Sequence, residues 1–68
     1  MKLKELHGNM GEKFLLMADI NIHPAITVYM VIESRHAFMT IVALNDGYVI
    51  EIGDSDGLLN SDILRVTA

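Results

Sequence analysis

AFMTIVALNDGYVIEI, residues 37–52, contains the strongest structural signal in this chain, because two apolar segments flank the short polar sequence NDG at 45–47. Asn, Asp and Gly tolerate the positive φ angles of a tight hairpin turn. Residues 37–44 are apolar on both faces of a strand, whereas the next segment alternates with the two-residue period of a strand: Tyr48, Ile50 and Ile52 on one side, Val49 and Glu51 on the other. The stretch therefore predicts an antiparallel β-hairpin.

Two more strands are predicted before this hairpin. From Lys13 onward, apolar residues alternate on one face: Phe14, Leu16, Ala18, Ile20 and Ile22. The sequence NIHP, residues 21–24, ends this alternation because proline has no backbone N–H to donate. Residues 25–33 are rich in β-branched side chains and predict a second strand. Its side chains expected to point inward are Ile26, Val28, Met30 and Ile32.

The ends of the chain complete an all-β prediction for one small domain, residues 1–68. Residues 2–7 predict a short helix, residues 53–62 a polar connection with a single helical turn, and residues 63–67 a fifth strand. We expect a five-stranded antiparallel meander with one short N-terminal helix. The helix is too short to cover a sheet face, so the sheet is expected to close into a small barrel or to be completed by a dimer partner.

Length and composition favour association. A domain of 68 residues buries only about 60% of the surface of its unfolded chain, and the absence of cysteine excludes disulfides and thiolate zinc sites. Because 51% of the residues are hydrophobic, we expect a homo-oligomer. No secretory signal is visible, and the longest apolar runs are far shorter than the roughly 20 residues of a spanning helix. These features predict a cytoplasmic protein without a membrane partner.

The charge distribution predicts the chemistry of the partner. The formal net charge is −4, made up of +1 over residues 1–13 and −5 over residues 14–68. Phosphate contacts come mainly from Lys and Arg, so this balance disfavours direct contact with nucleic acid. It favours a basic or nucleic-acid-binding protein as the partner.

Residues 45–62 carry five acidic residues and neither Lys nor Arg, which raises the question of a metal loop. Aligning Gly57 with the sixth position of an EF-hand loop places Ile52 and Ile63 at ligand positions, so a calcium site is not predicted and these acidic residues are interpreted as an ordinary solvated turn at the end of the hairpin. The three histidines lack metal-binding spacing and are interpreted as surface or turn residues: His7, His23 and His36. No metal and no cofactor are predicted.

The sequence also lacks the framework of a catalytic site. No nucleophile-elbow glycines surround any serine. Glu33 could serve as a general base only in a cleft that held a substrate. We therefore expect a non-enzymatic protein.

Two resemblances bear on these expectations. The layout from LKELHGNMGEKFLLMADI, residues 3–20, to SDILRV, residues 61–66, resembles the short helix and bent five-stranded sheet of Sm-like and SH3-like barrels. This resemblance covers topology and no diagnostic motif. VIESRHAFM, residues 31–39, and EIGDSDG, residues 51–57, are similar to acidic strand and turn segments of small phage-encoded DNA mimics that inhibit uracil-DNA glycosylase. That resemblance implies an inhibitor or regulator that presents carboxylates in place of phosphates.

The leading hypothesis is an acidic protein-binding module, and its expected contact residues combine carboxylates with aromatic anchors. They are Glu33, Phe38, Tyr48, Glu51, Asp54, Asp56 and Asp62. One alternative is an Sm-like or SH3-like oligomer that binds nucleic acid through Lys2, Lys4, Lys13 and Arg35. The other is a structural subunit of a larger assembly.

Overall fold

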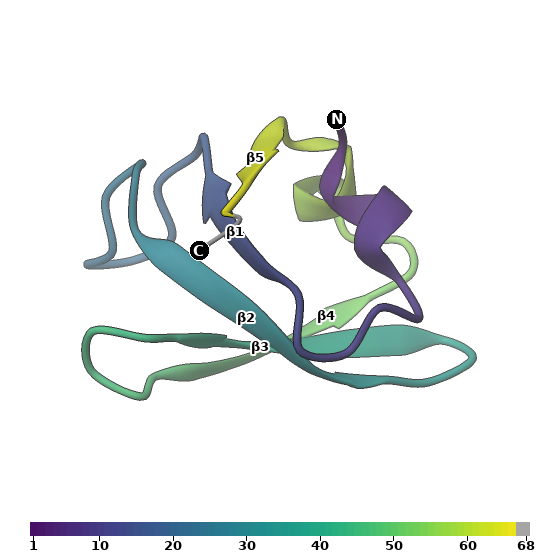
Figure 1. Cartoon of the computed structure of the whole chain (residues 1–68). Helices are drawn as coiled ribbons and strands as arrows, with labels where there is room; N and C mark the ends of the chain where they lie inside the picture. The colour runs from purple at the N-terminus through teal and green to yellow at the C-terminus, as the bar shows by residue number, and fades with distance from the viewer. Residues whose placement is uncertain (67–68) are drawn as a thin grey trace.

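The computed structural model describes residues 1–66 and consists mainly of one open sheet of five antiparallel strands (Figure 1). The strands are β1 (Lys13–Leu16), β2 (Val28–Ser34), β3 (Phe38–Ala43), β4 (Val49–Gly53) and β5 (Ile63–Arg65). Helical structure in the described residues is limited to two 3₁₀ helices, η1 (Leu3–Leu6) and η2 (Gly57–Asn60). The mainly β prediction is confirmed. Thr67, the end of the predicted fifth strand, lies outside the described residues.

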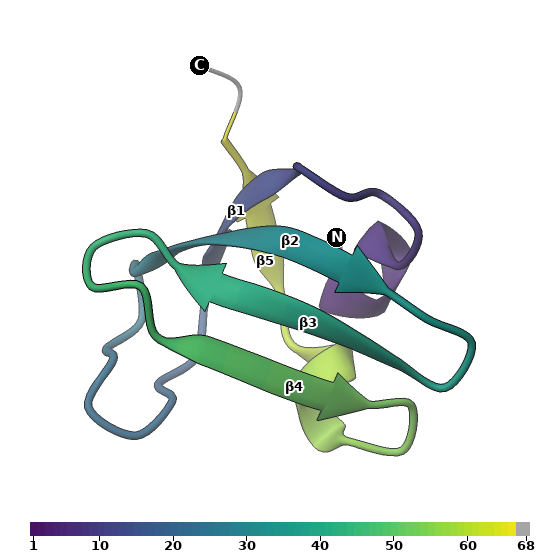
Figure 2. The ribbon, with the colours of Figure 1, turned by 90° about the horizontal axis from the view of Figure 1, so that it is seen from below.

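The strand order is β4-β3-β2-β1-β5, so the first four strands form a meander and β5 returns to pair with β1. Figure 1 shows β1 and β5 rising from the layer formed by β3 and β4, with η1 and η2 on the same side. We call this side the inner face of the sheet. The opposite side, the outer face, carries no other element of residues 1–66 (Figure 2).

The predicted hairpin turn is present between β3 and β4. The N–H of Gly47 donates to the Ala43 carbonyl at 2.8 Å, and the Ala43 N–H donates to the Tyr48 carbonyl at 2.9 Å. Gly47 has φ +75°. A side chain at this φ would crowd the backbone, which explains why glycine follows Asn45 and Asp46 here.

The core lies between the inner face and the two 3₁₀ helices. Its buried side chains are Leu3, Leu6, Phe14, Leu16, Ile20, Tyr29, Val31, Met39, Ile41, Ala43, Ile52 and Ile63. The rings of Phe14 and Tyr29 stack with their centroids 5.8 Å apart. The N–H of Leu3 donates to the Ser61 carbonyl at 3.0 Å, which holds η1 beside the end of η2. Two very short helices therefore cover the centre of a single sheet.

The prediction of which β2 side chains point inward is wrong. Tyr29 and Val31 are fully buried, whereas Ile26 is 70% exposed and precedes the strand. Ile32 is also exposed, and Val28 and Met30 are partly buried on the outer face. Because both sets of side chains in this segment are apolar, their alternation does not distinguish the two faces. The pairing of Phe14 with Tyr29 establishes the observed register.

The first strand is also shorter than predicted. It ends at Leu16, and Ile22, which was placed on its inward face, is 87% exposed. Residues 17–27 form a loop instead. Asp19 Oδ1 accepts a hydrogen bond from the Ala25 N–H at 2.6 Å, and Ile20 and His23 exchange two backbone hydrogen bonds of 2.8 Å. These local bonds replace the strand pairing that residues 17–22 would otherwise need.

Candidate functional site

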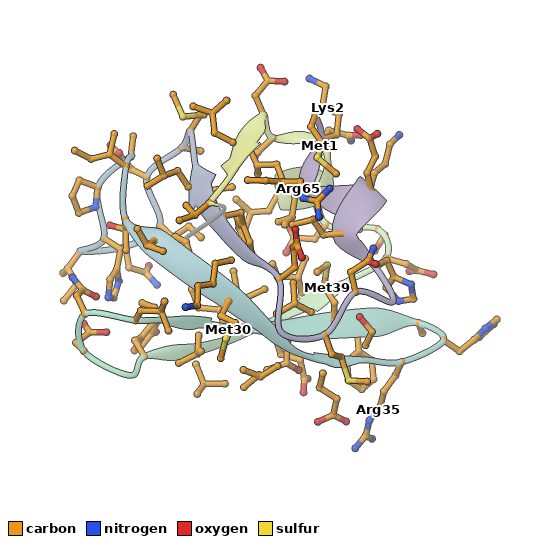
Figure 3. The ribbon with its side chains drawn as sticks, in the orientation of Figure 1. Met1, Lys2, Met30, Arg35, Met39 and Arg65 are labelled. Atoms are coloured by element: carbon orange, nitrogen blue, oxygen red, sulfur yellow. The ribbon has the colours of Figure 1, made fainter. Side chains whose placement is uncertain are left out.

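The outer face presents a row of apolar side chains across the sheet. Strand pairing places Lys13 opposite Met30, Met30 opposite Val42, and Val42 opposite Val49. Met30 and Val42 are partly buried, and Val49 is 55% exposed. In Figure 3, Met39 points toward the inner face, whereas Met30 and Arg35 lie on the opposite side. The outer face is therefore apolar in its middle and has no covering element among residues 1–66.

Four charged residues surround this apolar row. Lys13 is on β1, Glu51 is on β4, and Glu33 forms an ion pair with Arg35 at one end of β2. The Arg35 guanidinium carbon lies 5.5 Å from the centroid of the Phe38 ring, a cation–π geometry. The two basic and two acidic residues give the outer face no net formal charge.

Most of the carboxylates already have a partner within the chain. Glu12, Glu33 and Asp62 form ion pairs with Arg65, Arg35 and Lys2, respectively. Another four accept hydrogen bonds from backbone or histidine N–H groups: Glu5, Asp19, Asp46 and Asp56. Within residues 1–66, the Glu51 and Asp54 side chains have no hydrogen bond or ion pair. These two carboxylates are available to bind a partner.

Asp54 and Asp56 lie together on the loop between β4 and η2. The Asp54 N–H donates to the Ala37 carbonyl at 2.9 Å, which brings this loop beside the β2–β3 turn. Asp56 caps η2, since its Oδ1 accepts from the Leu58 N–H at 2.9 Å. Phe38, which is partly buried, is paired with Gly53, the residue before Asp54. We refer to Phe38, Asp54 and Asp56 as the acidic end of the sheet.

The structure brings some of the predicted contact residues together and separates others. Glu33 and Glu51 are both paired with Thr40, so they lie near the acidic end. Tyr48 lies at the opposite end of the β3–β4 hairpin, where its ring stacks on that of His23 at 5.0 Å. Asp62 lies before β5, 2.9 Å from the Lys2 ammonium group, which lowers the pKa of its carboxyl. The seven residues therefore do not form one surface.

His23 was missed as a buried residue. It was interpreted with His7 and His36 as a surface or turn residue, yet only 3% of it is exposed. Its Nε2 lies 2.7 Å from Asp46 Oδ2, and its Nδ1 is buried without a partner in residues 1–66. The Tyr48 N–H and His23 together lower the pKa of Asp46. No local pattern signals this contact, because the two residues are 23 positions apart.

The basic residues of the nucleic-acid alternative are dispersed. Lys2 is paired with Asp62, and Arg35 is paired with Glu33. Lys4 is on η1, and Lys13 is on β1. Two of the four cations are therefore neutralised locally, and the others belong to different elements.

Comparisons of the chain with protein-family models, with curated protein sequences and with solved structures give no match. No group of three or more His, Asp or Glu side chains in residues 1–66 is arranged to hold a metal ion. Over the same residues, neither 3₁₀ helix has the length and apolar character needed to cross a membrane.

Proposed function

We propose that this chain is a non-enzymatic protein-binding module whose acidic end binds a basic protein. The observation that carries the proposal is Asp54, an exposed carboxylate without a hydrogen bond or ion pair in residues 1–66, which directly follows Gly53, the strand partner of the partly buried Phe38. A cation of the partner would meet Asp54 without displacing an internal ion pair. Asp56 adds a second negative charge two residues away, and Phe38 offers an aromatic contact of the kind enriched at interfaces.

The class of partner follows from the remaining charge. Apart from the outer face, the chain has three basic and seven acidic residues, so its whole net charge of −4 lies elsewhere on the molecule. Such a field accelerates association with a positively charged protein. A protein that normally binds nucleic acid has such a positively charged surface. We therefore include in the proposal that the chain inhibits a protein of this kind, with its carboxylates in the sites that normally hold phosphates.

We further propose that the sheet has the general arrangement of Sm-like and SH3-like barrels. The return of β5 to β1 and the position of the short η1 beside the core support this proposal. It concerns architecture and does not transfer a nucleic-acid function. The internal pairing of Lys2 and Arg35 favours the acidic binding module over that alternative.

The test compares two variants that each raise the net charge by one, from −4 to −3. Asp54→Asn changes the acidic end, and Asn45→Lys changes the exposed turn at the other end of the β3–β4 hairpin. Tagged chains are used to recover proteins from nuclease-treated lysate at low and high salt. A protein bound by the wild type and by Asn45→Lys, but released by salt and by Asp54→Asn, supports the proposal. Equal binding by both variants, or retention of the chain itself on heparin, contradicts it.

A further inference from the structure

We propose that the outer face binds a second copy of this chain. This inference does not rest on the proposed function, because it concerns the apolar row Met30, Val42 and Val49 rather than the acidic end. In Figure 2, strands β2, β3 and β4 lie in front of η1, so the view is onto the face that no element covers. A small domain with part of its apolar surface outside gains stability by burying that surface against another chain.

The distribution of charge selects a second copy as the occupant. Lys13 and Arg35 balance Glu33 and Glu51, so the outer face is neutral, while the rest of the chain carries the net charge of −4. Two copies therefore repel each other in most orientations, because their surfaces have the same sign. The outer face is the surface through which two copies meet without that repulsion. A strongly basic partner would bind more favourably to the acidic surface of the rest of the molecule than to this neutral face.

The two unpaired charges on this face are also self-complementary. Lys13 and Glu51 have no side-chain partner in residues 1–66. They lie on β1 and β4, at opposite flanks of the apolar row, and three strand spacings separate these strands by about 14 Å. A two-fold axis that lies in the interface, parallel to the plane of the sheet and perpendicular to the line joining these two residues, crosses that line between β2 and β3. Such an axis brings Lys13 of each copy to Glu51 of the other, and the pair forms twice.

The area needed for a stable dimer determines how much of the outer face must be in contact. A standard interface uses about 800 Å² from each partner, which is about a fifth of the 4111 Å² exposed by this chain. One or two side chains cannot supply this area, so the contact has to extend from Lys13 to Glu51 across all four strands. Met30 and Val42, on the two strands that flank the axis, would form its centre.

Sedimentation of the full chain over a range of concentrations tests this inference. The chain has a mass of 7.6 kDa, so a dimer has twice this mass, 15.2 kDa. We expect Lys13→Glu and Glu51→Lys each to raise the dimer dissociation constant by about tenfold or more, since each change places like charges together twice. The double variant restores opposite charges, and its dissociation constant should return to within about threefold of the wild-type value.

Both positions are exposed, so we expect these variants to fold, and circular dichroism checks this. A wild-type chain that stays monomeric at millimolar concentration overturns the inference. So does a dimer that single reversals do not weaken, or a double variant that dimerises no better than the single ones. Val49→Ser gives an independent measurement: Val49 is 55% exposed, so its loss should weaken the dimer while leaving the monomer folded.

Discussion

His23 Nε2 lies 2.7 Å from Asp46 Oδ2, and this hydrogen bond joins the β1–β2 loop to the β3–β4 turn. A carboxylate can only accept, so Nε2–H is the donor. The other carboxylate oxygen, Asp46 Oδ1, accepts from the Tyr48 N–H at 2.9 Å. Both bonds favour the ionised form, and the Tyr48 bond makes the larger contribution to lowering the pKa of Asp46.

The lowered pKa predicts a stability difference that depends on pH. A carboxyl whose pKa is lower in the folded state stabilises it above the unfolded pKa of about 3.9, and this contribution is lost as pH falls through the folded pKa. Asp46→Asn should therefore unfold at lower urea concentration than the wild type at pH 7. The difference should shrink as pH falls below about 4. Asp54→Asn is the control, since the Asp54 side chain has no partner in residues 1–66; an equal effect of both variants at pH 7 would contradict the prediction.

Ile26 is held in a backbone conformation that isoleucine rarely adopts, with φ +77°. A β-branched residue at positive φ costs about 1–2 kcal/mol, and Ile26 is 70% exposed, so burial does not offset this cost. Ile26→Gly should raise the melting temperature, because glycine accepts this φ and keeps the N–H that donates to the Leu16 carbonyl at 3.1 Å. The net gain is about 1 kcal/mol or less, since glycine also adds entropy to the unfolded chain.

Ile22→Gly provides the matched control in the same loop. Ile22 is 87% exposed and has negative φ. Glycine at this position should lower stability by about 0.5–1 kcal/mol through chain entropy alone. An equal decrease in melting temperature for both glycine variants would contradict the prediction that the positive φ of Ile26 destabilises the folded state.

The sequence predicted the elements better than the orientation of their side chains. The hairpin at 37–52 was predictable because its turn residues have specific backbone preferences. The inward face of β2 was not, because Val28 and Met30 are as apolar as Tyr29 and Val31, and only pairing with β1 separates the two sets. The burial of His23 accompanies a hydrogen bond to Asp46, which is distant in the sequence. Neither the alternation of side chains nor the local composition predicts such a contact.

We expect burial of the Leu6 side chain to stabilise η1 more than the hydrogen bonds within this helix do. A four-residue helix is unstable alone, because helix nucleation costs more than one turn of hydrogen bonds returns. Leu3 and Leu6 are almost fully buried against the sheet, whereas Lys4 between them is exposed. Leu6→Ala should reduce the free energy of unfolding by about 2–5 kcal/mol. Lys4→Ala should leave it nearly unchanged, and urea unfolding measures both.

Tyr29 is fully buried, and its hydroxyl has no hydrogen-bond partner in residues 1–66. An unpaired buried hydroxyl costs free energy, so removing it should be neutral or stabilising. Tyr29→Phe keeps the stacked ring of Phe14 at 5.8 Å and should change the free energy of unfolding by less than about 1 kcal/mol. Phe14→Ala, which removes a ring from the same pair, should cost about 3–5 kcal/mol.

Tyr29→Phe should also change how stability depends on pH in the alkaline range. Burial of the Tyr29 side chain is the main cause that raises its pKa. A group whose pKa is raised on folding stabilises the folded state below its unfolded pKa, about 10, and that contribution is lost as pH rises through the folded pKa. The wild type should therefore lose stability above pH 10 faster than Tyr29→Phe, in which Tyr48 and the lysines still titrate. Parallel urea midpoints for the two proteins between pH 8 and about pH 11 would show that the Tyr29 hydroxyl reaches solvent.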